Sequence, residues 1–125
     1  MTNCMISAPQ PEAVEAGLEA FKRSGNVMDA AIAAALVQTV VDPQMCGIAG
    51  FGSMQIIRPQ DGESLFIDFH GSAPLSVTPD MWEQLIDREC DDGFGFVLKG
   101  RVNEFGYTSM TTPMTLRALD QALST

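Results

Sequence analysis

The stretch Asn26-Val27-Met28-Asp29-Ala30-Ala31-Ile32-Ala33-Ala34-Ala35-Leu36 largely decides the fold of this 125-residue chain. Asn26 is a favoured helix-capping residue, and Asp29, three positions further on, can complete a capping box with it. The helix is expected to run to about Val41, because the residue before Pro43 avoids the helical conformation. Its alanines leave little side-chain bulk on several faces. We therefore expect other elements to approach this helix closely and to sandwich it.

A second helix is expected just upstream, from Pro11 to Arg23. Val14, Leu18 and Phe21 fall at positions i, i+4 and i+7, which places one apolar stripe along it. Its initial proline suits a first helical turn, and Gly25 suits the position just after a helix end. The chain is thus predicted to begin with two consecutive helices.

Downstream of the helices, the pattern changes to that of a hairpin. Leu65, Ile67 and Phe69 recur at every second position, as in a strand, and Asp61-Gly62 is typical of a hairpin loop. The next expected elements are a glycine-rich turn (46–53), two strands (53–58 and 64–69) joined by a hairpin loop (59–63), and a turn (71–74). A helix is then expected from Thr78-Pro79-Asp80 to about Glu89. It is followed by an irregular loop with some extended structure (91–106), a short strand (107–111) and a final helix from Pro113. This order predicts a mixed α/β (α+β) fold class.

The charge balance argues against two classes of partner. Seven lysines and arginines face sixteen acidic residues, which gives a formal net charge of −9. A nucleic-acid-binding protein needs a basic surface, and an anionic membrane repels an acidic protein, so neither partner is expected. The apolar stretch Ala30–Val41 is shorter than the ~20 residues of a membrane span. It is therefore interpreted as a buried helix.

Cysteine and histidine usage predicts neither disulfides nor a metal site. Cys4, Cys46 and Cys90 are odd in number and far apart, and His70 is the one histidine. No cofactor is predicted. The N-terminus lacks the charged and apolar regions of a signal peptide. The location expected by default is therefore the cytoplasm, or the periplasm or cell exterior if the N-terminus is incomplete.

The glycines at 47, 50 and 52 are interpreted as backbone-packing positions. Nucleotide-binding glycine loops follow a strand and open a helix, whereas these glycines follow an expected helix and precede an expected strand. Close approach of another segment, where a Cβ would not fit, is the better explanation.

No complete catalytic constellation is visible. Asp68, His70 and Ser72 could suggest a catalytic triad, but residues two apart on a strand point alike and do not form a chain of contacts. For His70, a ligand-facing position and a structural loop position both remain open. Thr2, after removal of Met1, could use its own amine as a base, and Thr112 lies in a Thr-Thr pair, but nothing near either residue resembles a stabilised site.

Five segments in the right order resemble the start of the large subunit of the γ-glutamyltransferase (γ-glutamyltranspeptidase) family. The family has a helix followed by Gly-Gly-Asn-Ala-x-Asp-Ala-Ala-x-Ala, then Val-Glu-Pro, then Ser-Gly-Ile-Gly-Gly-Gly, and later a strand, an Ala-Pro turn and a Pro-Gly segment before a helix. The matching segments here are 15–35, 41–43, 46–52, 66–81 and 107–119.

This resemblance implies an N-terminal nucleophile hydrolase, with helices packed on a mainly antiparallel sheet in an αββα sandwich. Residues 1–125 would then form a single partial domain from the N-terminal part of the large subunit. In the family, a proenzyme cleaves itself, and the new N-terminal threonine attacks a γ-glutamyl amide such as that of glutathione. The implied partners are that substrate, the remainder of the large subunit and the small subunit.

The chain departs from the family at two places. Thr111-Thr112 is followed by Pro113 and not by the histidine of the Thr-Thr-His start, so no catalytic residue is predicted in this chain. The family also binds the substrate α-carboxylate with an arginine just before the Ala-Pro turn. Here the corresponding candidate substrate-binding positions hold His70 and Ser72, and neither supplies the charge and fork of arginine at neutral pH.

Three hypotheses follow. The first is an N-terminal fragment of a γ-glutamyltransferase-like enzyme that is inactive alone. The second is a non-catalytic binding or assembly domain that keeps the scaffold and self-associates, because apolar faces that lack the rest of the fold need cover. The third is an unrelated small α/β protein.

Overall fold

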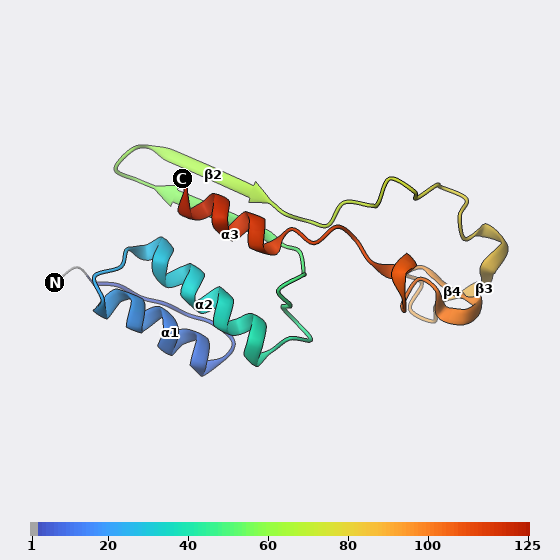
Figure 1. Cartoon of the computed structure of the whole chain (residues 1–125), viewed down its shortest axis with the longest axis horizontal. Helices are drawn as coiled ribbons and strands as arrows, with labels where there is room; N and C mark the ends of the chain where they lie inside the picture. The colour runs from blue at the N-terminus through green and yellow to red at the C-terminus, as the bar shows by residue number, and fades with distance from the viewer. Residues whose placement is uncertain (1–2) are drawn as a thin grey trace. The chain divides into compact units, whose positions relative to one another are not determined.

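The computed structural model describes residues 3–125, which form two compact units. The first unit contains residues 3–71 and 113–125, and the second contains residues 72–112. Figure 1 shows the helices and a hairpin of the first unit and a smaller hairpin in the second. Within residues 3–125, no helix combines the length and the apolar character needed to cross a lipid bilayer.

Helix α2 (Val27–Val41) begins at the predicted cap. The Asn26 side chain accepts hydrogen bonds from the backbone N–H groups of Met28 at 2.7 Å and Asp29 at 3.0 Å. Asp29 Oδ2 in turn accepts the Asn26 backbone N–H at 2.8 Å. The capping box is therefore complete, which satisfies N–H groups that would otherwise lack partners at the start of the helix.

Helix α1 (Pro11–Lys22) packs on α2 through small residues. A Cβ on Gly17 would lie 3.0 Å from the Ala30 carbonyl oxygen and would overlap the end of the Ile6 side chain, so the glycine lets both approach α1 closely. On its other side, α2 faces α3 (Thr115–Leu123) (Figure 1). The predicted sandwiching of this helix is confirmed.

Strands β1 (Ser53–Arg58) and β2 (Glu63–Asp68) form an antiparallel hairpin with Ser53 opposite Asp68. One face of the hairpin packs on α2 and α3. The buried core there is formed by Ile32, Ile67, Ala118, Leu119 and Ala122. Helices packed on an antiparallel hairpin confirm the predicted fold class.

Two predicted elements of the second unit are wrong. The helix expected up to Glu89 is instead a 3-10 turn (Glu83–Leu85) followed by strand β3 (Ile86–Glu89), which pairs antiparallel with β4 (Phe96–Leu98). Gly93 and Gly95 adopt positive φ in the turn that joins these strands, and the Cys90 N–H bonds the Gly95 carbonyl at 3.0 Å. Hairpin closure prevails because a short helix is stable only when an apolar face is buried.

The strand expected at 107–111 is also absent. A 3-10 turn (Tyr107–Ser109) occupies its place, after Gly106 with φ of 87°. Ser109 Oγ donates a hydrogen bond to the Gly106 carbonyl at 2.8 Å, which favours the turn. A strand would need a neighbouring strand to satisfy its backbone groups, and no strand of residues 72–112 pairs with this segment.

Candidate functional site

The candidate site lies where strand β2 ends, beside the glycine-rich turn that precedes β1. The Phe69 N–H donates to the Gly52 carbonyl at 3.0 Å, which extends the hairpin by one pair. A Cβ on Gly52 would lie 3.1 Å from the Phe69 ring, so the small residue lets the two segments meet. Phe51 consequently lies beside His70, with ring centroids 5.6 Å apart. The prediction that this glycine loop serves close backbone packing is thus correct at Gly52.

Asp68 and His70 are joined by two contacts. Asp68 Oδ1 accepts the backbone N–H of His70 at 3.0 Å and lies 2.7 Å from Nδ1 of its ring. Of the three residues Asp68, His70 and Ser72, which were not expected to form a chain of contacts, the first two do contact each other, because β2 ends at Asp68 and His70 lies beyond the strand. In such turns an aspartate bonds the backbone two residues ahead.

This arrangement leaves one ring nitrogen of His70 for a ligand. A carboxylate next to Nδ1 favours the proton on that atom, so Nε2 is an acceptor in the neutral ring and a donor in the charged one. The two side chains are 63% and 65% exposed, which leaves them accessible to solutes. The pair can therefore present an oriented imidazole, and when this is protonated it can donate one charged hydrogen bond to an anion.

The contacts with His70 also lower the pKa of Asp68. The backbone N–H is the larger cause and the side-chain hydrogen bond is the second. Both favour the ionised carboxylate, so they stabilise the fold at neutral pH and this contribution is lost as the pH falls through the lowered pKa. In a ¹³C NMR titration, Asp68 should titrate below the ordinary range of aspartate. His70→Ala should reverse only part of the shift, because the backbone N–H remains, and complete reversal would contradict this assignment.

The other sequence-predicted residues do not join this cluster. Ser72 is the first residue of the second unit, where its carbonyl accepts the Thr112 N–H at 3.0 Å. Thr112 is exposed, and Thr2 lies outside the described residues. Within residues 3–125, no three His, Cys, Asp or Glu side chains gather in a way that could hold a metal ion.

Phe51 is the site residue that sequence reasoning missed. The one sequence feature that could have identified it is its place between two glycines in a turn. A large aromatic side chain in such a turn is not expected to have a structural role in the core. It is mostly exposed, yet it forms one wall beside the His70 ring.

Comparisons with known proteins agree on one family. The family model for gamma-glutamyltranspeptidase matches residues 13–125. The glutathione hydrolase proenzyme of Bacillus subtilis (strain 168) is 33% identical over 119 residues, which cover 95% of this chain and 19% of that protein. The acylase ACY 1 proenzyme of Pseudomonas sp. (strain V22) is 34% identical over 120 residues, which cover 96% of this chain and 21% of that protein.

The solved structures show the same relationship. The gamma-glutamyltranspeptidase of Pseudomonas nitroreducens, complexed with L-DON, superposes with a TM-score of 0.79 and 25% identity. The match covers 99% of this chain and 34% of that one. The chain thus spans about a fifth of the length of the curated relatives it matches. With the family model matching nearly the whole chain, this protein belongs to the gamma-glutamyltranspeptidase family.

Proposed function

We propose that this chain is the N-terminal part of the large subunit of an enzyme that hydrolyses or transfers γ-glutamyl amides, and that it holds the substrate carboxylate. The observation that carries the proposal is the Asp68–His70 pair. It stands at the end of β2 and shortly before Ala73-Pro74, where the family resemblance places the carboxylate-binding arginine. The threonine nucleophile would come from sequence outside these 125 residues, so the chain is inactive alone.

Histidine at this position changes how a carboxylate is held. With Nδ1 engaged by Asp68, a protonated His70 offers a single N–H, whereas arginine offers two parallel ones. Carboxylate binding should therefore be weaker than with arginine. Substrates with a second point of attachment, such as an aromatic group beside Phe51, would be favoured.

A second candidate is a non-catalytic assembly domain. In residues 72–112, all of which the structure describes, Leu98 is the one buried side chain. Phe94, Phe105 and Tyr107 are largely exposed in the same unit. Exposed aromatic side chains in this number mark a surface that another protein or another copy covers. Sedimentation of the isolated chain distinguishes the candidates, because only the assembly domain requires a stable, monodisperse oligomer.

The activity can be tested by exchanging segments. The matching segment of the Bacillus subtilis glutathione hydrolase proenzyme is replaced by this chain, and release of p-nitroaniline from γ-glutamyl-p-nitroanilide is measured. We expect turnover with a KM raised about tenfold, since a single charged hydrogen bond replaces two. The isolated chain should give no turnover.

Two results would contradict the proposal. One is a folded and mature chimera without activity. The other is turnover by the isolated chain that disappears in Thr2→Ala or Thr112→Ala, because the nucleophile would then lie in this segment. Should the chimera fail to fold, NMR of the isolated chain at pH 5.5 tests the same site. L-glutamate should shift the His70 ring signals, whereas methylamine, which lacks a carboxylate, should not.

A further inference from the structure

Phe51 and His70 form an exposed pair of aromatic rings at the candidate site, named here the aromatic platform. Their ring centroids lie 5.6 Å apart, and the ring planes are inclined by 35° to each other. Phe51 is 65% exposed and the His70 side chain is 63% exposed, so both rings keep open faces although they lie side by side. A single exposed apolar side chain is common on protein surfaces, but this one borders a group that can bind a ligand. The platform is therefore a candidate recognition surface.

The same two residues are departures from the family pattern. The segment 46–52 matches Ser-Gly-Ile-Gly-Gly-Gly, in which the position of Phe51 is a glycine. His70 stands where the resemblance places the carboxylate-binding arginine. Because glycine has no side chain, the family pattern leaves free the space that the Phe51 ring occupies beside residue 70. Two changes far apart in the sequence thus meet at one place, where two flat rings stand instead of a permanent charge.

Two rings in this arrangement favour a third ring over a saturated group of the same size. Aromatic pairs attract one another at centroid separations of about 4.5–7 Å, beyond the effect of the apolar area that they bury. The platform itself falls within this range, so a ligand ring that packs across it can form the same kind of contact with both members. A cyclohexyl group would bury a similar area without that attraction. The platform therefore predicts a preference for aryl groups.

The carboxylate anchor determines where such an aryl group must be attached. Asp68 Oδ1 lies 2.7 Å from His70 Nδ1, so a carboxylate binds at Nε2, the other nitrogen of the same ring. A ring on the carbon next to that carboxylate stays close to the imidazole and can lie across Phe51. A ring attached further along the acyl group would need a longer flexible connection, and the entropy lost in ordering it would oppose binding.

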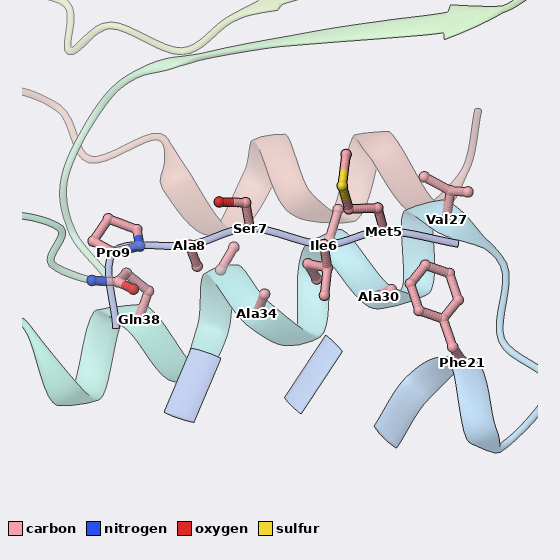
Figure 2. A pocket seen from close by; sticks show the side chains of 12 residues that line it. Met5, Ile6, Ser7, Ala8, Pro9, Phe21, Val27, Ala30, Ala34 and Gln38 are labelled. Carbon is pink, nitrogen blue, oxygen red and sulfur yellow. The ribbon is translucent and has the colours of Figure 1, made fainter. Parts of the chain in front are cut away.

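A groove elsewhere in the first unit is the competing site for an apolar ligand. It has a volume of about 380 Å³ and lies between residues 5–9 and α2, where Figure 2 shows Ala30, Ala34 and Gln38 next to the extended segment. None of the described residues that line it is a lysine, an arginine or a histidine. A carboxylate there would lose its hydration without a cationic partner. The groove can therefore take an uncharged apolar molecule, whereas an aryl carboxylate should bind at His70.

We propose that Phe51 makes the carboxylate site selective for acyl donors that carry an aryl group on the carbon next to their carboxylate. This inference rests on the proposed function, because His70 must hold the carboxylate. When such a donor is hydrolysed, the amide C–N bond breaks, and water adds its oxygen to the acyl carbon and a proton to the departing amine. The products are the amine and an aryl-substituted dicarboxylic acid. Phe51 takes no part in these steps and contributes only to the choice of donor.

The experiment measures the binding of small carboxylates to the full 125-residue chain by NMR of the Phe51 and His70 ring signals. Phenylacetate is compared with cyclohexylacetate, which has a saturated ring of similar size, and with phenylacetamide, which lacks the charge. We expect phenylacetate to bind about three- to tenfold more tightly than cyclohexylacetate, and phenylacetamide to leave the His70 signals in place. Equal affinities for the two carboxylates overturn the proposal, as do equal shifts with phenylacetamide.

Phe51→Leu tests whether the preference comes from the platform. Leucine keeps an apolar side chain at an exposed position, so the fold should persist while the ratio of the two affinities falls to about one. Phe66→Leu is the matched control, because Phe66 is 66% exposed on β2 and its loss should leave the ratio unchanged. If Phe51 only oriented His70, Phe51→Leu would weaken both carboxylates equally and keep the ratio, and that result overturns the proposal.

Two further measurements separate this inference from its alternatives. Ala31→Leu fills the groove at an exposed helix position and should leave phenylacetate binding unchanged, so weaker binding would place the ligand in the groove and overturn the proposal. L-Glutamate tests the proposed function itself. Shifts of His70 with L-glutamate, together with equal affinities for the two ring-bearing carboxylates, overturn the selectivity alone. The absence of a shift with any carboxylate contradicts the carboxylate site and this inference with it.

Discussion

Leu119→Ala is expected to remove about 3 kcal/mol from the free energy of unfolding of this chain. Leu119 is 5% exposed and lies in the core of the first unit, where α3 contacts Ile32 of α2 and Ile67 of β2. The core of this unit is small and consists largely of alanines, so the neighbouring side chains cannot close over the cavity that the substitution leaves. A large part of the total stability of the chain should therefore be lost.

Leu116→Ala provides the matched control for this measurement. Leu116 lies on the same helix but is 51% exposed, so its truncation should cost well under half as much. Urea denaturation followed by circular dichroism gives both free energies. Equal losses in the two variants would show that α3 does not pack on the hairpin as described.

His70→Arg is expected to lower the KM of the segment-exchange chimera for γ-glutamyl-p-nitroanilide by about tenfold, with a smaller change in kcat. Arginine restores a permanent charge and two parallel N–H donors for the carboxylate, and charged hydrogen bonds contribute about 1.5–3 kcal/mol each. The fold should be unaffected, because residue 70 is exposed and its turn is held through the backbone.

Ser72→Arg is the comparison that separates the two candidate positions. Both residues precede Ala73-Pro74, but only His70 belongs to the cluster with Asp68 and Phe51. An equal or larger gain with Ser72→Arg would move the carboxylate site to residue 72. An active chimera in which neither variant lowers KM would contradict the site while leaving the proposed activity in place.

The sequence predicted the first unit well because local signals and burial agree there. The capping box at Asn26, the apolar stripe of α1 and the Asp61-Gly62 turn each specify an element through neighbouring residues. Helix α2 and the β1–β2 hairpin then bury a common core with α3, so tertiary packing reinforces the local preferences there.

The second unit could not be predicted in this way. The apolar residues around Met81 and Leu85 have helical spacing, but the unit offers no core against which a helix face could pack. Positive φ at Gly93 and Gly95 decides the outcome instead, and the conformation of a glycine cannot be read from its identity. At the site, the sequence identified Asp68 and His70 but not their contact, because that depended on β2 ending one residue earlier than expected.

The hydrogen bond from the residue 70 backbone to Asp68 has a consequence for how such proteins diversify. Because the turn is fixed by a main-chain N–H, the side chain at position 70 can be exchanged without rebuilding the loop. A single substitution there can therefore change the chemical group that the turn presents to solvent, at little cost to the scaffold.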